Sequence, residues 1–394
     1  MIHPDKKLAR RFDLPSRSRA YTELVYSGDS GTREEIREKL MADQKVRMPG
    51  APEYNVYFGD IHGHSNLSDG RPSADEYFIG LRDRAKLDFG ALTDHDHGGV
   101  GSKEQWDGKW ELIKEKVKEY NEPGKFTTIL AYERDSYPWY NNMVVYYDNY
   151  EGELLRGEHP GELTRDELRS YLAREDLILV PHDTCTLFSG TDFLAMELED
   201  MTPLIQVSSR DNYSERMVPE LVFDAACEGG HWQDALKRGA RMGCISCSDD
   251  HTGNGGLILE EKGYPLKYPG ITGVWAKENT LSALFEALKA RRCYGFMGGR
   301  ITLDFRINGH YMGEEFAVSP DADLEIYYNI EADGEVDTVT IVKNCRDYII
   351  FQGKKSQLMY DYRREQETDC YYVRVKLKDG RYAWSSPIWV NKEM

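Results

Sequence analysis

Histidine and acidic residues stand directly after five apolar runs of this sequence, and these residue types in this position can bind metal ions. His62 and His64 follow the first run two positions apart, so on an extended chain their rings share one face and can reach one ion. Asp249 and His251 have the same spacing. Neutral imidazole combined with carboxylate favours zinc, manganese or iron(II) over calcium, which takes oxygen ligands.

The five runs end in a similar way along the chain. Their ends read Asp60-Ile61-His62-Gly63-His64, Thr93-Asp94-His95-Asp96-His97, Tyr132-Glu133-Arg134-Asp135, Pro181-His182-Asp183 and Ser248-Asp249-Asp250-His251. A single histidine near a strand end is more often a capping or surface residue. Histidines and acids at five successive ends instead indicate one shared site, because parallel sheets and barrels build their sites at the carboxyl ends of their strands.

Short apolar runs alternate with helical patterns between about residue 54 and residue 299. Ser73 with Glu76, and Thr164 with Glu167, have capping-box spacing and predict two helix starts. Strands are predicted at 56–61, 89–93, 126–132, 177–180, 204–207, 244–247 and 271–276. The alternation predicts an α/β fold whose parallel sheet closes, or nearly closes, into a barrel.

From about residue 300 the pattern changes to short strands separated by turn residues. The turn signals are Asn308-Gly309, Ala332-Asp333-Gly334 and Lys378-Asp379-Gly380. This pattern predicts a small C-terminal all-β sandwich. We therefore expect three parts: a lead-in over 1–53 that packs on the barrel, a metal-binding barrel over 54–299 and the sandwich over 300–394.

The composition narrows the classes of function. The 394 residues carry a formal net charge of −18, which disfavours nucleic acid and anionic membranes as partners. The sequence has no run of about 18 apolar residues and no secretory pattern at its N-terminus, so we expect no membrane span. Its seven cysteines are scattered and odd in number, which is typical of free thiols in a cytoplasmic protein. Cys244 and Cys247, three apart on a predicted strand, would face opposite ways.

Taken together, the strand ends resemble a known family. The series D-x-H-x-H, S-D-G (Ser68-Asp69-Gly70), T-D-H-D, a lone glutamate, P-H-D and S-D-x-H is similar to the polymerase-and-histidinol-phosphatase (PHP) domain over about residues 54–300. Segment 372–389 also resembles the C-terminal part of a bacterial PHP-like subgroup. The resemblance implies a distorted seven-stranded (β/α) barrel, two or three bound divalent metal ions and, as in many members, hydrolysis of phosphate esters.

By position, the resemblance implies three metal clusters. His62, His64, Glu133 and Asp249 would hold one ion, Glu133 would bridge to a second ion bound by His182, and Asp69, His95 and His251 would hold a third. Gln206 departs from the family pattern, which usually has His, Cys or Glu there. An amide oxygen is a weak zinc ligand, so the occupancy of the second position is open.

Two ions about 3.5–4 Å apart would activate a bridging water as hydroxide and stabilise the displaced oxygen. A leaving alkoxide also needs a proton, and the candidates beside the implied ligands are Asp96, His97 and Asp183. The alternative for these three is support of the ligating imidazoles. Arg210 is a candidate clamp for a substrate oxyanion, and its alternative is an ordinary structural role.

Three functions stay open at this point. The leading hypothesis is a metal-dependent phosphoesterase that uses zinc, manganese or iron and acts on a small anionic organic substrate. The second is a metal-dependent hydrolase or lyase acting on a carbohydrate, ester or amide, because the sequence offers no clear Gly-rich phosphate loop. The third is a non-catalytic metal-containing binding protein. The sequence predicts no oligomeric state.

Overall fold

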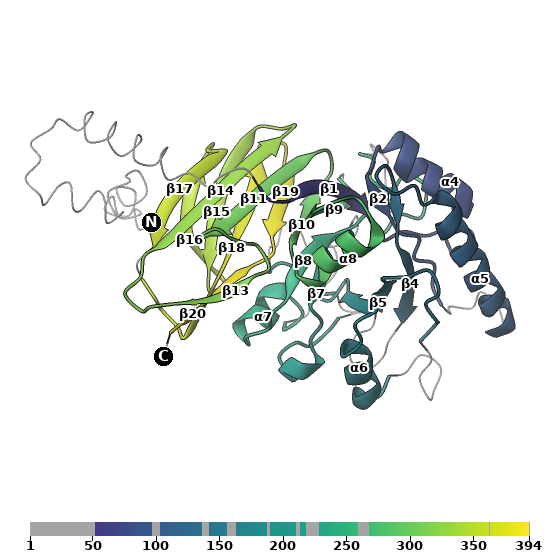
Figure 1. The fold of residues 1–394 in the computed structure, drawn as a ribbon, viewed down its shortest axis with the longest axis horizontal. Coiled ribbons are helices and arrows are strands. Elements are labelled where there is room, and N and C mark those ends of the chain that lie inside the picture. The colour runs from purple at the N-terminus through teal and green to yellow at the C-terminus, as the bar shows by residue number, and fades with distance from the viewer. Residues whose placement is uncertain are drawn as a thin grey trace, which may run out of the picture.

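The computed structural model describes residues 52–96, 103–135, 142–155, 163–186, 190–209, 213–217, 228–258, 268–361 and 363–393. Helices and strands alternate in the first part of the chain, and strands dominate from residue 301 onward. The two parts lie side by side (Figure 1). Residues 1–51 of the expected lead-in, which was predicted over 1–53, lie outside the described residues.

Strands and helices of the first part run from residue 55 to residue 297. Its strands are β1 (Asn55–Asp60), β2 (Phe89–Gly90), β3 (Thr127–Thr128), β4 (Leu130–Asp135), β5 (Asn142–Tyr147), β6 (Leu177–Pro181), β7 (Leu204–Ser208), β8 (Gly243–Ser246), β9 (Gly270–Ala276) and β10 (Cys293–Met297). Its helices are α4 (Ala74–Ile79), the π-helix η1 (Gly80–Arg84), α5 (Lys103–Tyr120), α6 (Arg165–Leu172), the 3₁₀-helix η2 (Leu198–Asp200), α7 (Trp232–Lys237) and α8 (Leu281–Lys289). Both predicted capping boxes are confirmed, because Ser73 caps α4 and Thr164 caps α6, each with its glutamate bonded back to the cap.

The sheets of this part are mixed, which corrects the expectation of a parallel sheet. β1, β2 and β3 pair in parallel, as do β7 and β8. By contrast, β4, β5 and β6 pair antiparallel, and β9 runs antiparallel to both β1 and β10. The chain returns from β4 to β5 across residues 136–141, a connection too short for the crossover that a parallel pair needs. The seven-stranded barrel stays a prediction.

One apolar cluster lies between the strands of the first part and supports the residues at their ends. Side chains at alternate positions of a strand point to the same face. The cluster takes two such apolar residues from the end of each of three strands, and the next residue on that face is a candidate ligand. In this way Ile129 and Ala131 precede Glu133, Ile178 and Val180 precede His182, and Ile245 and Cys247 precede Asp249. The period-2 alternation therefore carries the candidate ligands toward the same interior.

The C-terminal part is built from two sheets. Its strands are β11 (Ile301–Ile307), β12 (His310–Tyr311), β13 (Glu315–Val318), β14 (Leu324–Ala332), β15 (Val336–Lys343), β16 (Arg346–Gln352), β17 (Ser356–Asp361), β18 (Thr368–Leu377), β19 (Tyr382–Ser385) and β20 (Ile388–Lys392). Strands β12, β11, β14 and β17 form one sheet, and β18 links β15, β19 and β20 in the other. The predicted turn at Asn308-Gly309 is confirmed, because both residues have positive φ and join β11 to β12.

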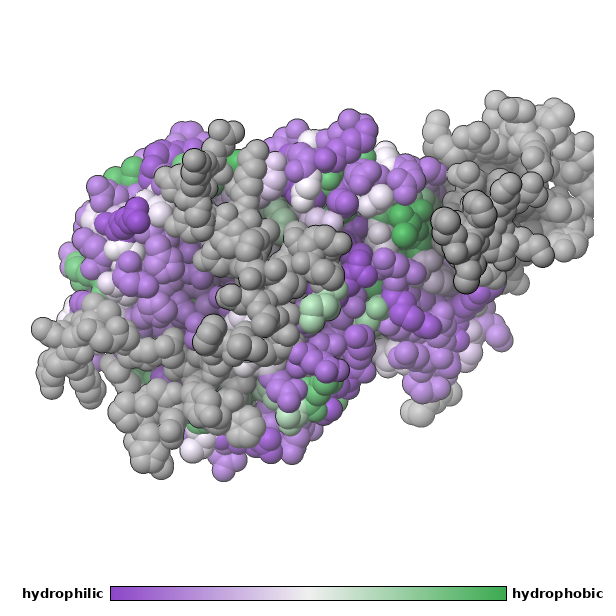
Figure 2. All heavy atoms as spheres, turned by 180° about the vertical axis from the view of Figure 1, so that it is seen from behind, coloured by the Kyte–Doolittle hydropathy of each residue, from purple (hydrophilic) through white to green (hydrophobic). Residues whose placement is uncertain are grey.

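The second of these sheets does not stop at the predicted domain limit. β19 pairs antiparallel with β10, so hydrogen bonds run continuously from the C-terminal sheet into the sheet of β9 and β1. The limits at 53 and 299 stay predictions. Seen from behind, the described surface is mostly hydrophilic with scattered apolar spots (Figure 2). Among the helices of these residues, none combines the length and the apolar character needed to cross a membrane.

Candidate metal centre

The candidate ligands come from five strands, β1, β2, β4, β6 and β8, and the turns that follow them. His62 and His64 follow β1, Glu133 lies in β4, and His182 follows β6. Single bridges join the strand ends: Gly63 pairs with Asp250 beyond β8, and His95 beyond β2 pairs with Glu133. The structure thus brings together all eight residues that the sequence analysis named as metal ligands, in three groups whose ligand atoms lie within 4.8 Å of one another, and Asp183 joins one of these groups.

The first group is buried and consists of His62, His64, Glu133 and Asp249. His62 Nε2 lies 3.2 Å from Glu133 Oε2 and 3.3 Å from Asp249 Oδ1, and His64 Nε2 lies 3.1 Å from each of these oxygens. Four tetrahedral ligands about 2.1 Å from one ion stand about 3.4 Å apart. The spacing of the four atoms therefore fits a single divalent ion.

A second group lies on the other edge of the His64 ring and is more exposed. Asp69 Oδ2 is 3.2 Å from His251 Nε2, and Asp69 Oδ1 is 3.6 Å from His64 Nδ1 and 3.7 Å from His95 Nε2. The His95 and His251 rings each stack on His64. The side chain of Asp69 is 52% exposed, so this group faces solvent.

Glu133 connects the first group to His182. Its Oε2 faces His62 and His64, whereas its Oε1 is 2.9 Å from His182 Nε2. Asp183, a predicted catalytic residue, forms a third metal-capable group with His182 and Asp249. Asp183 and Asp249 both have positive φ, at 52° and 54°, a conformation that non-glycine residues rarely adopt. Such backbone strain is typical of functional sites.

The carboxylates of the centre have a distinctive set of partners. Within the described residues, the ion-pair partners of Glu133, Asp249 and Asp69 are all histidines, with neither lysine nor arginine among them. Buried carboxylates need a compensating positive charge. Imidazole supplies it only when protonated, whereas a divalent cation would supply it with the histidines neutral. The donor set therefore fits resident cations.

Burial and pairing oppose each other in the pKa values of these groups. Burial alone would raise the pKa of Glu133, but His182, His62 and His64 lower it well below its usual value. Burial alone would lower the pKa of His64, but Asp249 and Glu133 raise it well above its usual value. Burial also works against the proton on His182, and Glu133 and Asp183 outweigh it and raise that pKa. The carboxylates of the centre thus favour a positive charge between them and the histidines.

Two supporting residues were not assigned these roles from the sequence. Asp94 is buried and accepts hydrogen bonds from the backbone and hydroxyl groups of both Ser65 and Ser68, which fixes the turn that carries Asp69. Gln206 Oε1 lies 3.0 Å from His62 Nδ1, the ring atom that faces away from the first group. The sequence signal for Asp94 was its place between Thr93 and His95, but nothing in a single sequence names its partners.

The other predicted catalytic residues have different outcomes. Asp96 is buried and its Oδ2 lies 3.4 Å from Arg134 Nη1, while Arg134 also donates to the carbonyl of Leu155. This pair gives Asp96 an arginine partner, and both its catalytic role and its support of a ligating imidazole stay predictions. His97 and Arg210 lie outside the described residues, so their roles stay predictions.

Comparisons with known proteins give distant matches. A family model described as a protein of unknown function (DUF3604) matches residues 246–332. The chain is 24% identical over 364 residues to an uncharacterized protein of Chlamydia pneumoniae, covering 86% of this chain and 57% of that protein. It is 23% identical over 399 residues to an uncharacterized protein of Chlamydia muridarum, covering 91% and 61%. The chain thus spans about three-fifths of the length of these curated relatives.

Among solved structures, the chain is similar to a two-domain protein of Bacteroides vulgatus that contains a predicted PHP-like metal-dependent phosphoesterase. The identity is 14%, the TM-score is 0.43, and the match covers 88% of this chain and 97% of the other.

Proposed function

We propose that this chain is a metal-dependent hydrolase that acts on a phosphate ester of a small organic molecule. The observation that carries the proposal is the convergence of His62 Nε2, His64 Nε2, Glu133 Oε2 and Asp249 Oδ1 at ion-ligand spacing in a buried position. The choice of a phosphate ester rests on the resemblance of the motif series to the PHP domain.

We assign the ligands as follows. The first ion would be held by His62, His64, Glu133 and Asp249, a second by Glu133 and His182 with Asp183 beside them, and a third by Asp69, His95 and His251. Imidazole and carboxylate together suit zinc, manganese or iron(II). When bound, two such ions supply an activated water and stabilise charge on the displaced oxygen.

The side chains of the chain itself have three tasks in this proposal. The two oxygens of Glu133 face different groups and thereby fix the spacing between two ions. Asp183 is only partly buried and lies beside His182 and Asp249, so we assign it the proton for the leaving alkoxide. Asp96 is held by Arg134, so we assign it a supporting role; His97 and Arg210 stay candidates for proton transfer and for clamping the anion.

An anionic substrate is compatible with the negative net charge of the chain. The formal charge is −18, yet the field within a metal pocket is set mainly by the ions and their ligands. Positive charge held at the centre would attract a phosphate locally. The same net charge keeps nucleic acid out of the proposal.

The test begins with protein stripped of metal by a chelator and reloaded separately with Mn²⁺, Zn²⁺ or Fe²⁺. A panel of small phosphomonoesters and diesters is then assayed beside carboxylic esters, amides and glycosides, with Asp249→Asn as the inactive control. We expect metal-dependent release of phosphate or of an alcohol from a phosphate ester. Full metal content without turnover of any phosphate would overturn the proposal, and turnover of another ester, amide or glycoside would favour the second hypothesis.

A further inference from the structure

Gln206 is a buried amide whose oxygen contacts the back of a candidate ligand. It lies in β7 and is 2% exposed. Its Oε1 is 3.0 Å from His62 Nδ1, while the Nε2 of the same ring faces Glu133 and Asp249. The oxygen that could have served as a weak ligand for a second ion is therefore engaged by His62.

This contact selects one of the two neutral forms of the imidazole. An amide oxygen can only accept a hydrogen bond, so His62 carries a proton on Nδ1. An ion bound between His62 Nε2 and the carboxylates of Glu133 and Asp249 would then meet the lone pair of Nε2. With the amide reversed, Nδ1 would accept, and the proton would sit on Nε2, where the ion belongs. The orientation of Gln206 thus decides whether His62 can bind a metal.

We propose that Gln206 is a positioning residue that holds His62 in the Nδ1–H tautomer, so that Nε2 binds the metal. Ligating histidines generally donate their other N–H to such a partner, and loss of the partner typically costs 10–100-fold in metal affinity. Here the partner is neutral and adds no negative charge to a centre that already holds Glu133 and Asp249. The inference rests on the metal-binding part of the proposed function and is independent of the bond that is hydrolysed.

The amide of Gln206 has one hydrogen-bonded end among the described residues. Its amide nitrogen Nε2 is buried and has no hydrogen-bond partner among the residues that the structure describes. The amide is therefore held at its oxygen end, by His62. Gln233 offers a matched comparison, because it is also a buried glutamine but donates its Nε2 to Tyr372 Oη at 2.7 Å, away from the ligands.

The experiment compares Gln206→Met, which has a similar size but lacks the acceptor, with Gln206→Glu, which keeps an acceptor, and with Gln233→Met as the control. The dissociation constant of Mn²⁺ is measured by calorimetry on metal-free protein. We expect Gln206→Met to weaken Mn²⁺ binding about 10–100-fold. Gln206→Glu should bind at least as tightly as the wild type, and Gln233→Met should bind as the wild type does.

A second readout reports the tautomer directly. In ¹⁵N-histidine-labelled protein loaded with Zn²⁺, His62 should show a protonated Nδ1 and a metal-bound Nε2, and this signature should be lost in Gln206→Met. The wild-type spectrum alone tests the proposal if that variant does not fold. An unchanged Mn²⁺ affinity in Gln206→Met, equal weakening in Gln206→Glu, or a protonated His62 Nε2 in the loaded wild type would each overturn it. Absence of phosphate-ester turnover in wild-type protein that binds Mn²⁺, with the expected weakening in Gln206→Met, would instead contradict only the proposed function.

Discussion

Glu133 and Glu215 are both almost completely buried, with exposures of 1% and 0%, but they meet different groups. Glu215 accepts hydrogen bonds from the hydroxyls of Tyr213 and Tyr372, from Trp384 Nε1 at 2.9 Å and from Arg374 Nε at 3.0 Å. Among the described residues, the ion-pair partners of Glu133 are imidazoles, with His182, His64 and His62 at 2.9, 3.1 and 3.2 Å.

The difference separates a structural acid from one arranged for an ion. Glu215 has a permanent counter-charge in Arg374 and donors on both oxygens, so its network is complete without a ligand. It also joins the segment after β7 to β18 and β19, and so helps to hold the two parts of the chain together. The partners of Glu133 can lose their protons, and a cation can then take the place of those protons.

The largest expected effect comes from removing the charge of Glu133. Glu133→Gln keeps the size of the side chain but takes away the carboxylate that faces His62, His64 and His182. We expect phosphate-ester turnover to fall by about 10³-fold or more, together with loss of bound metal. Metal content by mass spectrometry and initial rates measure the two effects.

The matched control for this substitution is Glu175→Gln. The Glu175 side chain is 95% exposed and pairs with Lys289 at the surface. It should retain full metal content and wild-type turnover. If Glu133→Gln kept full metal content and wild-type rates, Glu133 would not be a metal ligand and would not differ in function from Glu215.

The next largest expected effect comes from removing the charge of Glu215. Glu215→Gln replaces an acceptor-only group by an amide that cannot accept from all four donors, and it leaves Arg374 with Asp347 as its remaining acidic partner. Breaking a buried charge pair typically costs about 3–5 kcal/mol, so a large shift of the urea unfolding midpoint is expected. Metal bound per folded molecule should stay unchanged; a loss of metal at full stability would contradict a structural role.

Removal of metal should destabilise the protein by a smaller amount. A ligand that binds only the folded state at ten times its dissociation constant contributes about 1.4 kcal/mol. Chelator-treated protein is therefore expected to melt at a lower temperature than metal-loaded protein. Glu133→Gln should show little or no such difference. An equal melting temperature for the wild type with and without metal would argue against a resident ion in the buried first group.

Much of the fold was accessible from local patterns in the sequence. The capping boxes at Ser73 and Thr164 and the turn at Asn308 each depend on a few neighbouring residues, and each is confirmed. The opposite orientation of Cys244 and Cys247 is also confirmed, because the two side chains join different apolar clusters. These features follow from backbone geometry alone.

The features of the fold and the site that local patterns did not predict depend on contacts between residues far apart in the sequence. The antiparallel insertion of β5 between β4 and β6 sets strand order, which an apolar run does not encode. The pairing of β10 with β19 likewise crosses an expected domain limit. At the site, residue types and spacing indicated the ligands, but the contact of Gln206 with His62 joins residues 144 positions apart and needed coordinates.

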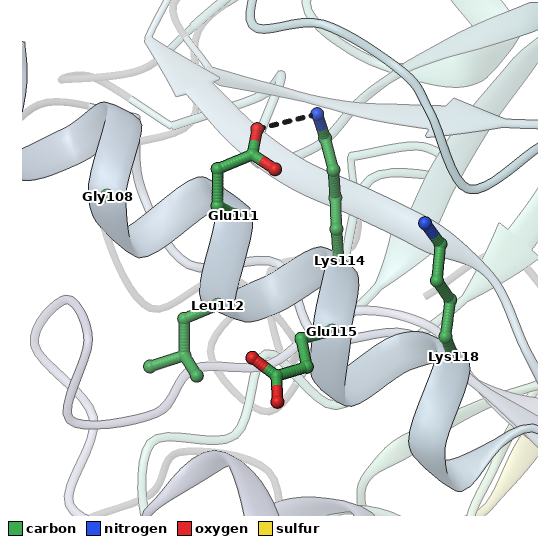
Figure 3. A pocket seen from close by; sticks show the side chains of 6 residues that line it. All are labelled: Gly108, Glu111, Leu112, Lys114, Glu115 and Lys118. Carbon is green, nitrogen blue, oxygen red and sulfur yellow. Dashed lines mark hydrogen bonds and ion pairs between the residues drawn. The ribbon is translucent and has the colours of Figure 1, made fainter.

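The smallest expected effect concerns charges that are paired at the surface. Side chains of α5 between Gly108 and Lys118 include an ion pair, in which Glu111 Oε1 lies 2.9 Å from Lys114 Nζ (Figure 3). The Glu111 side chain is 72% exposed, so water and salt screen the pair.

Glu111→Gln should therefore change the free energy of unfolding by at most about 0.5 kcal/mol and leave metal binding and turnover unchanged. Urea unfolding at low and high salt measures the effect, which should shrink further as salt rises. If Glu111→Gln lowered the free energy of unfolding as much as Glu215→Gln does, burial and complete pairing would not determine how much each acid contributes to stability. We expect large effects at Glu133 and Glu215 and a small one at Glu111, because water can replace the partner of exposed Glu111 but cannot reach the partners of the two buried glutamates.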